Sequence, residues 1–172
     1  MEIKDQEKVW DAIACEWNEF KEIPSDFSKE FLGSCTGKVL DLGSGSGRHL
    51  TKISDGKIYL VDFSQEMLNL AEKKAKKLKI SAEFKKGDLW KIPYERDFFD
   101  FGICISALHC ISPEYHKKVA EEIYRVLKDE GKALIGVWNY NSKRFKSKRK
   151  KGKEHYIGWR DKGKRYYYLF EE

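Results

Sequence analysis

The chain has 172 residues and a net charge of +6. This length suits a single domain, residues 1–172, with a core large enough to be stable. No apolar run approaches the ~20 residues of a membrane span, and the charged N-terminus lacks a signal-peptide core. These features exclude a membrane protein and favour a cytoplasmic one.

The positive charge is concentrated at the C-terminal end. Residues 143–172 hold 12 Lys and Arg against 4 Asp and Glu, a net charge of +8, which leaves residues 1–142 with −2. A basic segment on a neutral body predicts a polyanionic partner, with RNA as the leading candidate and no DNA expected. The alternative is a solvated charge run without a partner.

The four cysteines form no C-x-x-C pair. We therefore expect reduced thiols in a cytosolic protein and no metal site. The four are Cys15, Cys35, Cys104 and Cys110.

Residues 1–36 are predicted to form a helical segment that precedes the first strand. Large apolar residues recur there at helical spacing and form one stripe, which indicates core packing: Trp10, Ile13, Trp17 and Phe20. Pro24 breaks the pattern. Ser25 is expected to cap a second, shorter helix that ends at Gly33.

The chain is organised around residues 39–48. Lys38–Leu42 reads as one buried strand, and alternate glycines follow it at 43, 45 and 47. Glycine allows a sharp turn, a positive φ and close approach of a ligand. His49–Ile53 is then expected to open a helix whose first amides face a nucleotide-like ligand.

The next strand ends in an acid. Asp55-Gly56 is expected to turn the chain, and Ile58–Val61 to form a second buried strand. Asp62 ends this strand, 19 residues after Gly43, where a carboxylate can accept both hydroxyl protons of a ribose. Ser64 is expected to cap a following amphipathic helix.

Three more strands complete the predicted sheet. Ala82–Lys85 is short and is expected at the sheet edge, residues 98–106 form the fourth strand, and Lys132–Trp138 the fifth. Ser112-Pro113 is expected to cap the helix between the last two strands. Strands that alternate with helices predict an α/β fold, a doubly wound and mostly parallel sheet with helices on both faces.

The last segment differs in composition. Residues 143–153 hold eight basic residues in eleven and predict a loop. Aromatic, strand-prone runs at 155–160 and 165–170 flank a glycine-bearing turn and predict a hairpin, which would close the sheet in antiparallel fashion.

The core, residues 37–138, resembles the class I S-adenosylmethionine-dependent methyltransferases, because its glycines stand at the first, third and fifth positions of the loop with an acid two residues ahead. That resemblance implies S-adenosylmethionine as cofactor and S-adenosylhomocysteine as product. It also implies that an acid after the third strand binds the adenine amino group. The expected cofactor-binding residues are Asp41, Gly43, Ser44, Gly45, Gly47, Arg48, Asp62, Phe63, Asp88, Leu89 and Ser106.

The flanks resemble the tRNA methyltransferases that esterify a carboxymethyl group on the wobble uridine. The similar stretches are residues 10–17 with Lys21 and Pro24, then Val137-Trp138, Trp159-Arg160 and residues 165–170. The resemblance implies tRNA as acceptor and a small zinc-containing activator subunit, which would dock at the open edge near Ala82–Lys85. The chain ends about 30 residues earlier than the resemblance leads us to expect.

A carboxylate acceptor needs no general base, because it is already ionised at neutral pH. Its methylation requires positioning. Arg160 or Arg165 is expected to bind the acceptor carboxylate, and His109 to orient it. The expected substrate-binding residues are Lys21, Trp138, Asn139, Trp159 and Tyr166.

Two other functions remain open at this point. A small-molecule methyltransferase acting on a quinone or another metabolite would use the same cofactor residues. A non-catalytic RNA-binding protein would keep the basic segment without turnover.

Overall fold

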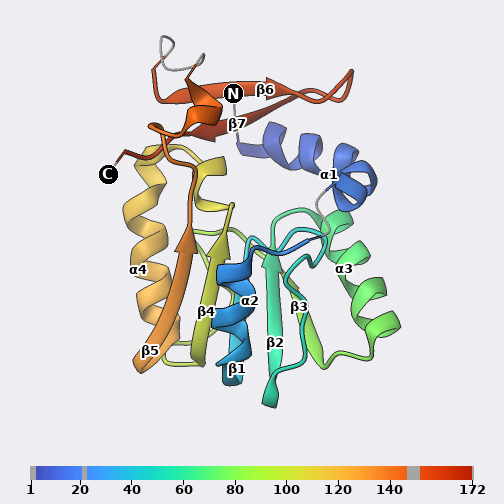
Figure 1. Cartoon of the computed structure of the whole chain (residues 1–172), viewed down its shortest axis with the longest axis vertical. Helices are drawn as coiled ribbons and strands as arrows, with labels where there is room; N and C mark the ends of the chain where they lie inside the picture. The colour runs from blue at the N-terminus through green and yellow to red at the C-terminus, as the bar shows by residue number, and fades with distance from the viewer. Residues whose placement is uncertain (1–2, 21–22, 147–151, 172) are drawn as a thin grey trace.

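The computed structural model describes residues 3–20, 23–146 and 152–171. Within them, five strands form one parallel sheet in the order β3-β2-β1-β4-β5. The strands are β1 Thr36–Leu42, β2 Ser54–Asp62, β3 Ala82–Lys86, β4 Phe99–Ile105 and β5 Leu127–Gly136. The predicted α/β sheet is confirmed, with β3 at its edge. All five carboxyl ends lie at the same side, the upper side in Figure 1.

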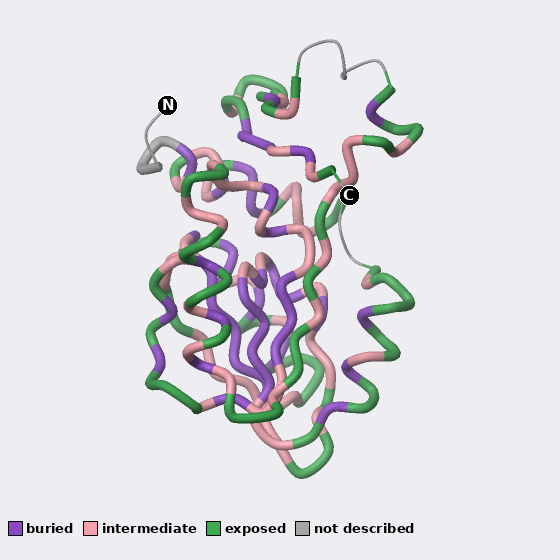
Figure 2. Tube along the Cα trace, turned by 90° about the vertical axis from the view of Figure 1, so that its left-hand side faces the viewer, coloured by how far each residue is buried: buried purple, intermediate pink, exposed green. Residues whose placement is uncertain are grey.

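Helices cover both faces of this sheet, with α2 and α3 on one face and α4 on the other (Figure 1). The helices are α1 Ile3–Phe20, α2 Asp26–Gly33, α3 Gln65–Leu78 and α4 His116–Val126. Successive strand residues point to opposite faces. In β2, Ile58 and Leu60 therefore pack beside α3, whereas Tyr59 and Val61 pack on the α4 side. The buried residues in Figure 2 accordingly gather along the strands.

Two of the three predicted helix caps are present. The Ser25 side chain accepts the amide of Ser28, and that of Ser64 accepts the amide of Met67, both at 3.2 Å. The prediction for Ser112 is wrong, because a short 3-10 turn follows it and its side chain caps nothing. Helix α4 begins after this turn.

The helix predicted directly after the glycine loop does not form. Residues 45–49 form a series of turns, in which Gly47 donates to the carbonyl of Ser44 and Leu50 to that of Gly47, and residues 50–53 run irregularly into β2. A helix of five residues would make too few hydrogen bonds to offset the cost of its nucleation. The connection from β3 to β4, residues 87–98, likewise contains no helix.

Asp55-Gly56 lies inside β2 and does not turn the chain, contrary to the prediction. At Gly56 the strand passes very close to β1, since an added Cβ would stand 1.9 Å from the carbonyl oxygen of Gly37. The glycine therefore permits a close strand contact.

The C-terminal hairpin does not join the main sheet, so the predicted closure of the sheet is wrong. β6 (Glu154–Gly158) and β7 (Lys164–Tyr168) pair antiparallel as a separate two-stranded sheet. Figure 1 shows this hairpin and α1 lying across the carboxyl ends of the strands. We call α1, β6 and β7 together the cap.

A buried amide explains where the hairpin docks. The Gln6 side chain on α1 donates to the carbonyl of Lys164 at 3.1 Å and accepts the amide of Tyr166 at 2.9 Å. It therefore takes the hydrogen bonds that a neighbouring strand would offer to β7. The predicted apolar stripe of α1 is only partly core, because Trp10 and Ile13 are buried whereas Phe20 is 61% exposed.

The segment after β5 contains a short 3-10 helix, η3 (Lys143–Phe145). Residues 147–151 of the predicted basic loop lie outside the described residues. Among the helices that are described, none combines the length and apolar character needed to cross a membrane.

Candidate functional site

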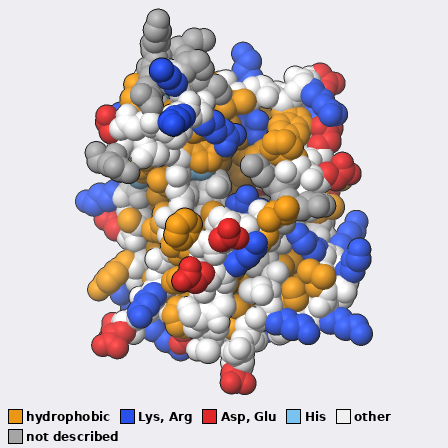
Figure 3. Space-filling model, in the orientation of Figure 1, with side chains coloured by type: hydrophobic (Ala, Val, Ile, Leu, Met, Phe, Trp, Pro, Cys, Tyr) orange, Lys and Arg blue, Asp and Glu red, His pale blue; other side chains and the backbone are white. Residues whose placement is uncertain are grey.

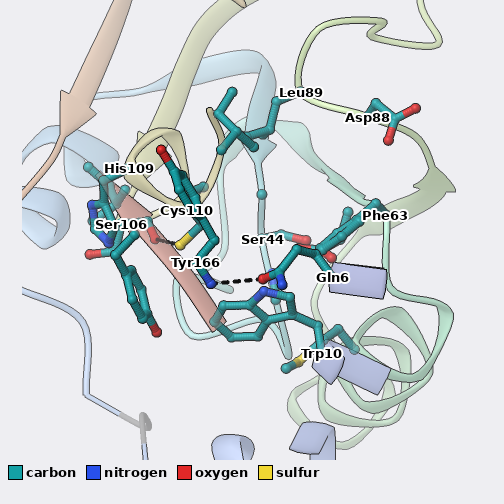
Figure 4. Close-up of a pocket in the computed structure, with 18 of the residues that line it drawn as sticks. Gln6, Trp10, Ser44, Phe63, Asp88, Leu89, Ser106, His109, Cys110 and Tyr166 are labelled. Carbon is teal, nitrogen blue, oxygen red and sulfur yellow. Dashed lines mark hydrogen bonds between the residues drawn. The ribbon is translucent and has the colours of Figure 1, made fainter. Parts of the chain in front are cut away.

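A cavity of about 360 Å³ lies between the carboxyl ends of the strands and the cap (Figure 4). Small-molecule sites commonly have volumes of roughly 300–1,000 Å³. Most of the predicted site residues line it: Gly43, Ser44, Gly45, Arg48, Asp62, Phe63, Asp88, Leu89, Ser106, His109, Trp138 and Tyr166. Residues from both ends of the chain thus face one space.

Other predicted site residues lie away from this cavity. Asp41 is buried near the end of β1. Gly47, the last glycine of the loop, lies against Leu50 and Ala71, and Asn139 forms a bridge to Phe170. Trp159, Arg160 and Arg165 pack within or on the cap and do not line the cavity. Lys21 lies outside the described residues.

The glycine loop has the backbone that its sequence predicts at its three glycines. Gly43, Gly45 and Gly47 have φ values of 70°, 54° and 75°, a region that side chains disfavour. A Cβ on Gly43 would stand 2.2 Å from the Cβ of Ala107, whereas a Cβ on Gly45 would meet no atom within 4 Å. Gly43 therefore allows two segments to pack, and Gly45 leaves open space beside the cavity.

Asp62 holds the loop from the end of β2. Its carboxylate is buried and accepts the amides of Gly45 at 2.8 Å and Ser64 at 2.9 Å. Burial raises the pKa of this carboxyl to about 6, and the two amides oppose the shift. Since each oxygen can accept a second hydrogen bond, Asp62 keeps acceptor capacity toward a ligand.

Polar groups without hydrogen-bond partners surround the loop. Within the described part of the chain, the Ser44 hydroxyl is buried and has no partner, and it lines the cavity. Beneath it, the Asp41 carboxylate lies 3.7 Å from His49 Nδ1. The Arg48 guanidinium is half-buried, and burial lowers its pKa while Asp41 opposes that shift. An unpaired buried hydroxyl is costly, so a ligand that bonds to it is favoured.

The loop after β3 supplies Asp88 and Leu89 to the cavity (Figure 4). Burial raises the pKa of Asp88, and Glu7 adds to the shift while Lys86 opposes it. Hydrogen bonds from α4 hold this irregular loop. Arg125 donates to the carbonyl of Tyr94 at 2.8 Å and to that of Ile92 at 3.0 Å.

His109 lies on the opposite wall and is neutral. Its ring is 1% exposed and stacks on Trp138, with ring centres 4.4 Å apart. Burial lowers its pKa to about 3, with a smaller contribution from Arg144. Nδ1 accepts the backbone amide of Trp138 at 3.2 Å, so the ring proton is on Nε2. His109 can therefore donate one hydrogen bond and is not placed to remove a proton through Nδ1.

Trp138 is not a free stacking platform. Besides His109, its ring stacks on Tyr167 at 4.5 Å, and the Arg144 guanidinium carbon lies 4.7 Å from its centre. A splayed-out base would have to displace one of these groups.

The two hairpin arginines lie apart from the cavity. The Arg165 side chain is buried, and its guanidinium carbon is 4.8–5.7 Å from the rings of Trp10, Trp17, Trp159 and Tyr167. Arg160 is 73% exposed and pairs with Glu16 at 3.4 Å. In this arrangement neither arginine reaches a ligand in the cavity.

Sequence reasoning missed several residues that line the cavity, notably Gln6, Trp10, Trp90, Tyr115 and Tyr167. The spacing of Trp10 favours core packing, and Tyr167 belongs to a tyrosine cluster, which is more often core than a platform for stacking a base. Gln6 stands one helical turn before Trp10, so an amide next to an apolar stripe was the available signal.

A parallel sheet with a glycine loop after its first strand and a carboxylate at the end of the second defines a nucleotide-binding α/β protein. A family described as "Methyltransferase domain" matches residues 39–131. The chain belongs to this methyltransferase family, as the class I resemblance predicted.

Two curated relatives point to different acceptors. The tRNA (carboxymethyluridine(34)-5-O)-methyltransferase of Arabidopsis thaliana is 31% identical over 80% of this chain and 33% of its own length. A demethylmenaquinone methyltransferase of Oceanobacillus iheyensis is 34% identical over 56% of this chain and 42% of its own. The chain thus spans less than half of either protein.

Among solved structures, a DhpI-SAM-HEP complex matches 99% of this chain and 83% of its own, with a TM-score of 0.73 and 20% identity. The PH0226 protein from Pyrococcus horikoshii matches 94% of this chain and 79% of its own, with a TM-score of 0.66 and 23% identity. These similarities show the fold.

Proposed function

We propose that the protein binds S-adenosylmethionine in the cavity and transfers its methyl group. The observation that carries this proposal is the pairing of Asp62 with Gly45 beside the open space that Gly45 leaves. Bound there, S-adenosylmethionine would supply an activated methyl group. The unpartnered Ser44 hydroxyl and the half-buried Arg48 suit a charged amino-acid group, and Asp62 suits a ribose diol.

Asp88 and Leu89 would hold the adenine, the carboxylate accepting its amino group and the Leu89 amide donating to a ring nitrogen. Phe63 and Ser106 would contact the rest of the cofactor, since both line the cavity. The remaining predicted residues, Asp41 and Gly47, do not line the cavity and would act indirectly, by shaping the glycine loop.

For the acceptor, we propose a carboxymethyl group on the wobble uridine of a tRNA, converted to its methyl ester. The Arabidopsis relative and the basic C-terminal segment support this acceptor. A carboxylate needs no base, which agrees with a cavity whose histidine is neutral and hydrogen-bonded through Nδ1. His109 Nε2–H would orient the acceptor, and Tyr166 would line its path. The protein's contribution is positioning and exclusion of water.

Incubation with labelled methyl donor and total tRNA, followed by nucleoside mass spectrometry, tests both parts of the proposal. We expect label in one modified uridine. Label found only in small molecules would contradict the tRNA acceptor, and no labelled product together with no cofactor binding would favour a non-catalytic RNA-binding protein.

A matched pair of variants tests the basic segment. Alanine at residues 148–151 should weaken tRNA binding and make it less sensitive to salt, because phosphate contacts release counterions. Alanine at Lys73, Lys74, Lys76 and Lys77 of α3 removes the same number of charges and should have little effect. Equal effects of the two variants would contradict a specific role for the segment.

A quinone or another small aromatic metabolite is the second candidate acceptor. The aromatic and aliphatic lining beside His109, including Trp90, Ile111 and Tyr115, supports it, as does the Oceanobacillus relative. Methyl transfer to a quinol that is unaffected by the 148–151 variant would favour this alternative.

We also propose that a small zinc-containing partner docks at β3, one of the two edge strands of the described sheet. Co-expression with such a subunit should protect the amides of Ala82–Lys86 from hydrogen exchange. Unchanged exchange there would contradict this docking site.

A further inference from the structure

Three arginines follow β5 in the described part of the chain, and only one of them is available to an anion. Arg160 pairs with Glu16, and Arg165 is enclosed by aromatic rings. Arg144 is exposed, and within the described residues no carboxylate lies within ion-pairing distance of it. Lys and Arg side chains gather at the upper left of the face in Figure 3, where Figure 1 draws the segment after β5.

Packing fixes the position of Arg144. It is the middle residue of η3, whose last residue, Phe145, is buried and lies 5.1 Å from the Trp138 ring. The guanidinium carbon of Arg144 lies 4.7 Å from the centre of the Trp138 ring and 5.4 Å from that of Phe145. A guanidinium stacked on aromatic rings keeps its planar N–H edge free for an oxyanion.

The same tryptophan connects Arg144 to the cavity. Arg144 is not itself among the residues that line the cavity, but Trp138 lines it and stacks on His109, which lines it too. The positive charge of Arg144 reaches this wall, since it lowers the pKa of His109.

An anionic acceptor needs a cation such as Arg144 at the His109 side of the cavity. Glu114 and Glu154 line the cavity and would repel a carboxylate. The arginine that lines the cavity, Arg48, follows the glycine loop, where the amino-acid end of the cofactor is proposed to bind.

We propose that Arg144 binds an oxyanion of the acceptor nucleotide, either its carboxylate or an adjoining phosphate, at the rim of the cavity beside Trp138. This rests on the proposed transfer to a carboxymethyluridine in tRNA. It assigns to Arg144 the anion-binding role that the sequence predicted for Arg160 or Arg165.

The test compares Arg144→Gln and Arg144→Lys with Arg96→Ala, an exposed arginine that precedes β4 at the opposite end of the sheet. For each folded variant we would measure the KM for tRNA that carries carboxymethyluridine and the inhibition constant of the same tRNA with an uncharged carbamoylmethyl group. Calorimetry would give the affinity for S-adenosylmethionine.

Arg144→Gln should raise the KM about tenfold or more, as expected for loss of a charge-assisted hydrogen bond, with kcat and cofactor affinity little changed. The KM of Arg144→Lys should lie between those of the parent and Arg144→Gln, because lysine keeps the charge but lacks the two parallel N–H donors of a guanidinium. Arg96→Ala should match the parent. If only the carboxymethyl tRNA binds more weakly to the variant, the anion is the carboxylate. If both tRNAs bind more weakly to the same extent, and the number of ions released on binding falls by about one, the anion is a phosphate.

An unchanged KM in Arg144→Gln, with an active parent, would overturn the proposal for Arg144 alone. A parent protein that methylates no tRNA would overturn the proposed function, and this inference with it. The activity of the parent therefore separates the two failures.

Discussion

The carboxylate of Asp62 accepts the backbone amide of Gly45 at 2.8 Å, which ties the end of β2 to the loop that follows β1. Its other oxygen accepts the amide of Ser64 at the start of α3. Because both donors belong to the backbone, the carboxylate is oriented before a ligand binds. The residue proposed to hold the ribose thus also fixes the loop that would lie against the cofactor.

The pKa of Asp62, raised to about 6, predicts a pH-dependent cofactor affinity. Below that pH the carboxyl of the ligand-free protein is protonated and accepts ligand hydroxyls poorly. Affinity for S-adenosylmethionine should therefore fall as the pH drops through 6 and level off above it, which calorimetry between pH 5 and 8 would measure.

Asp62→Asn should bind at least ~10-fold more weakly at neutral pH, because charge-assisted hydrogen bonds are lost, and should show little change around pH 6. Asp26→Asn removes a fully exposed carboxylate on α2 and should keep the parent profile. An Asp62→Asn protein with the parent's pH profile would refute the assignment.

Two of the three glycines of the loop, Gly43 and Gly45, should respond differently to alanine. In Gly43→Ala the new methyl would lie 2.2 Å from Ala107 at a φ of 70°, so steric overlap adds to the roughly 1–2 kcal/mol cost of the left-handed conformation. In Gly45→Ala the new methyl meets no other atom, so the loss of stability should be limited to that conformational cost. The methyl would, however, enter the space proposed for the cofactor and weaken its binding. Urea unfolding and cofactor calorimetry would compare the two.

Ala107→Gly provides a control for the steric part, because it removes the atom that the new methyl would meet. Combined with Gly43→Ala, it should restore part of the lost stability. No recovery in the double variant would show that backbone strain alone accounts for the loss.

The fold and the cofactor side of the site could be predicted from local patterns. Lys38–Leu42 and Ile58–Val61 read as strands because both of their faces are buried, and the carboxyl ends of parallel strands converge. That convergence predicts Asp62 beside the glycine loop, where its carboxylate binds the amide of Gly45.

The acceptor side could not be predicted, because it depends on contacts between opposite ends of the chain. Gln6 binds β7 from a helix some 160 positions earlier, and no local pattern reports such a bond. Trp159 and Arg165 likewise look available in the sequence, yet Trp17 of α1 covers both. Tertiary packing decided which aromatic and cationic groups reach the cavity.

An ion pair on α4 should control the loop that carries Asp88. Arg125 binds Glu122 at 2.6 Å and donates to two loop carbonyls, and Glu122 accepts the amide of Ile92 at 2.8 Å. Arg125→Met would leave these carbonyls without partners, at a cost of ~1 kcal/mol for each lost hydrogen bond.

We therefore expect faster hydrogen exchange across residues 87–98 of Arg125→Met and about tenfold weaker cofactor binding, while the exchange of β1 is unchanged. Arg125→Lys should recover part of the affinity. Exchange that is equally slow in the loops of variant and parent would contradict a positioning role for this pair.

The buried His109 should make the stability of the protein depend on pH. Burial lowers its pKa from the ordinary 6.5 to about 3, so the folded state stays neutral where the unfolded chain binds a proton. The contribution of His109 to the free energy of unfolding should therefore be fully retained above pH 6.5 and fall as the pH drops toward 3, by up to ~1.4 kcal/mol per pH unit. The carboxyl of Asp62, whose pKa is raised, opposes this fall below pH 6.

His109→Gln keeps an oxygen that can accept the amide of Trp138 and carries no titrating group. Urea titrations at pH 7 and pH 5 should show a smaller loss of stability in this variant than in the parent. The slope should not vanish, because burial lowers the pKa of His116 as well and raises that of Asp62, whose contribution to the slope has the opposite sign. Identical slopes for variant and parent would mean that His109 becomes protonated in the folded protein, and the neutral, Nε2-protonated ring proposed to orient the acceptor would then be wrong.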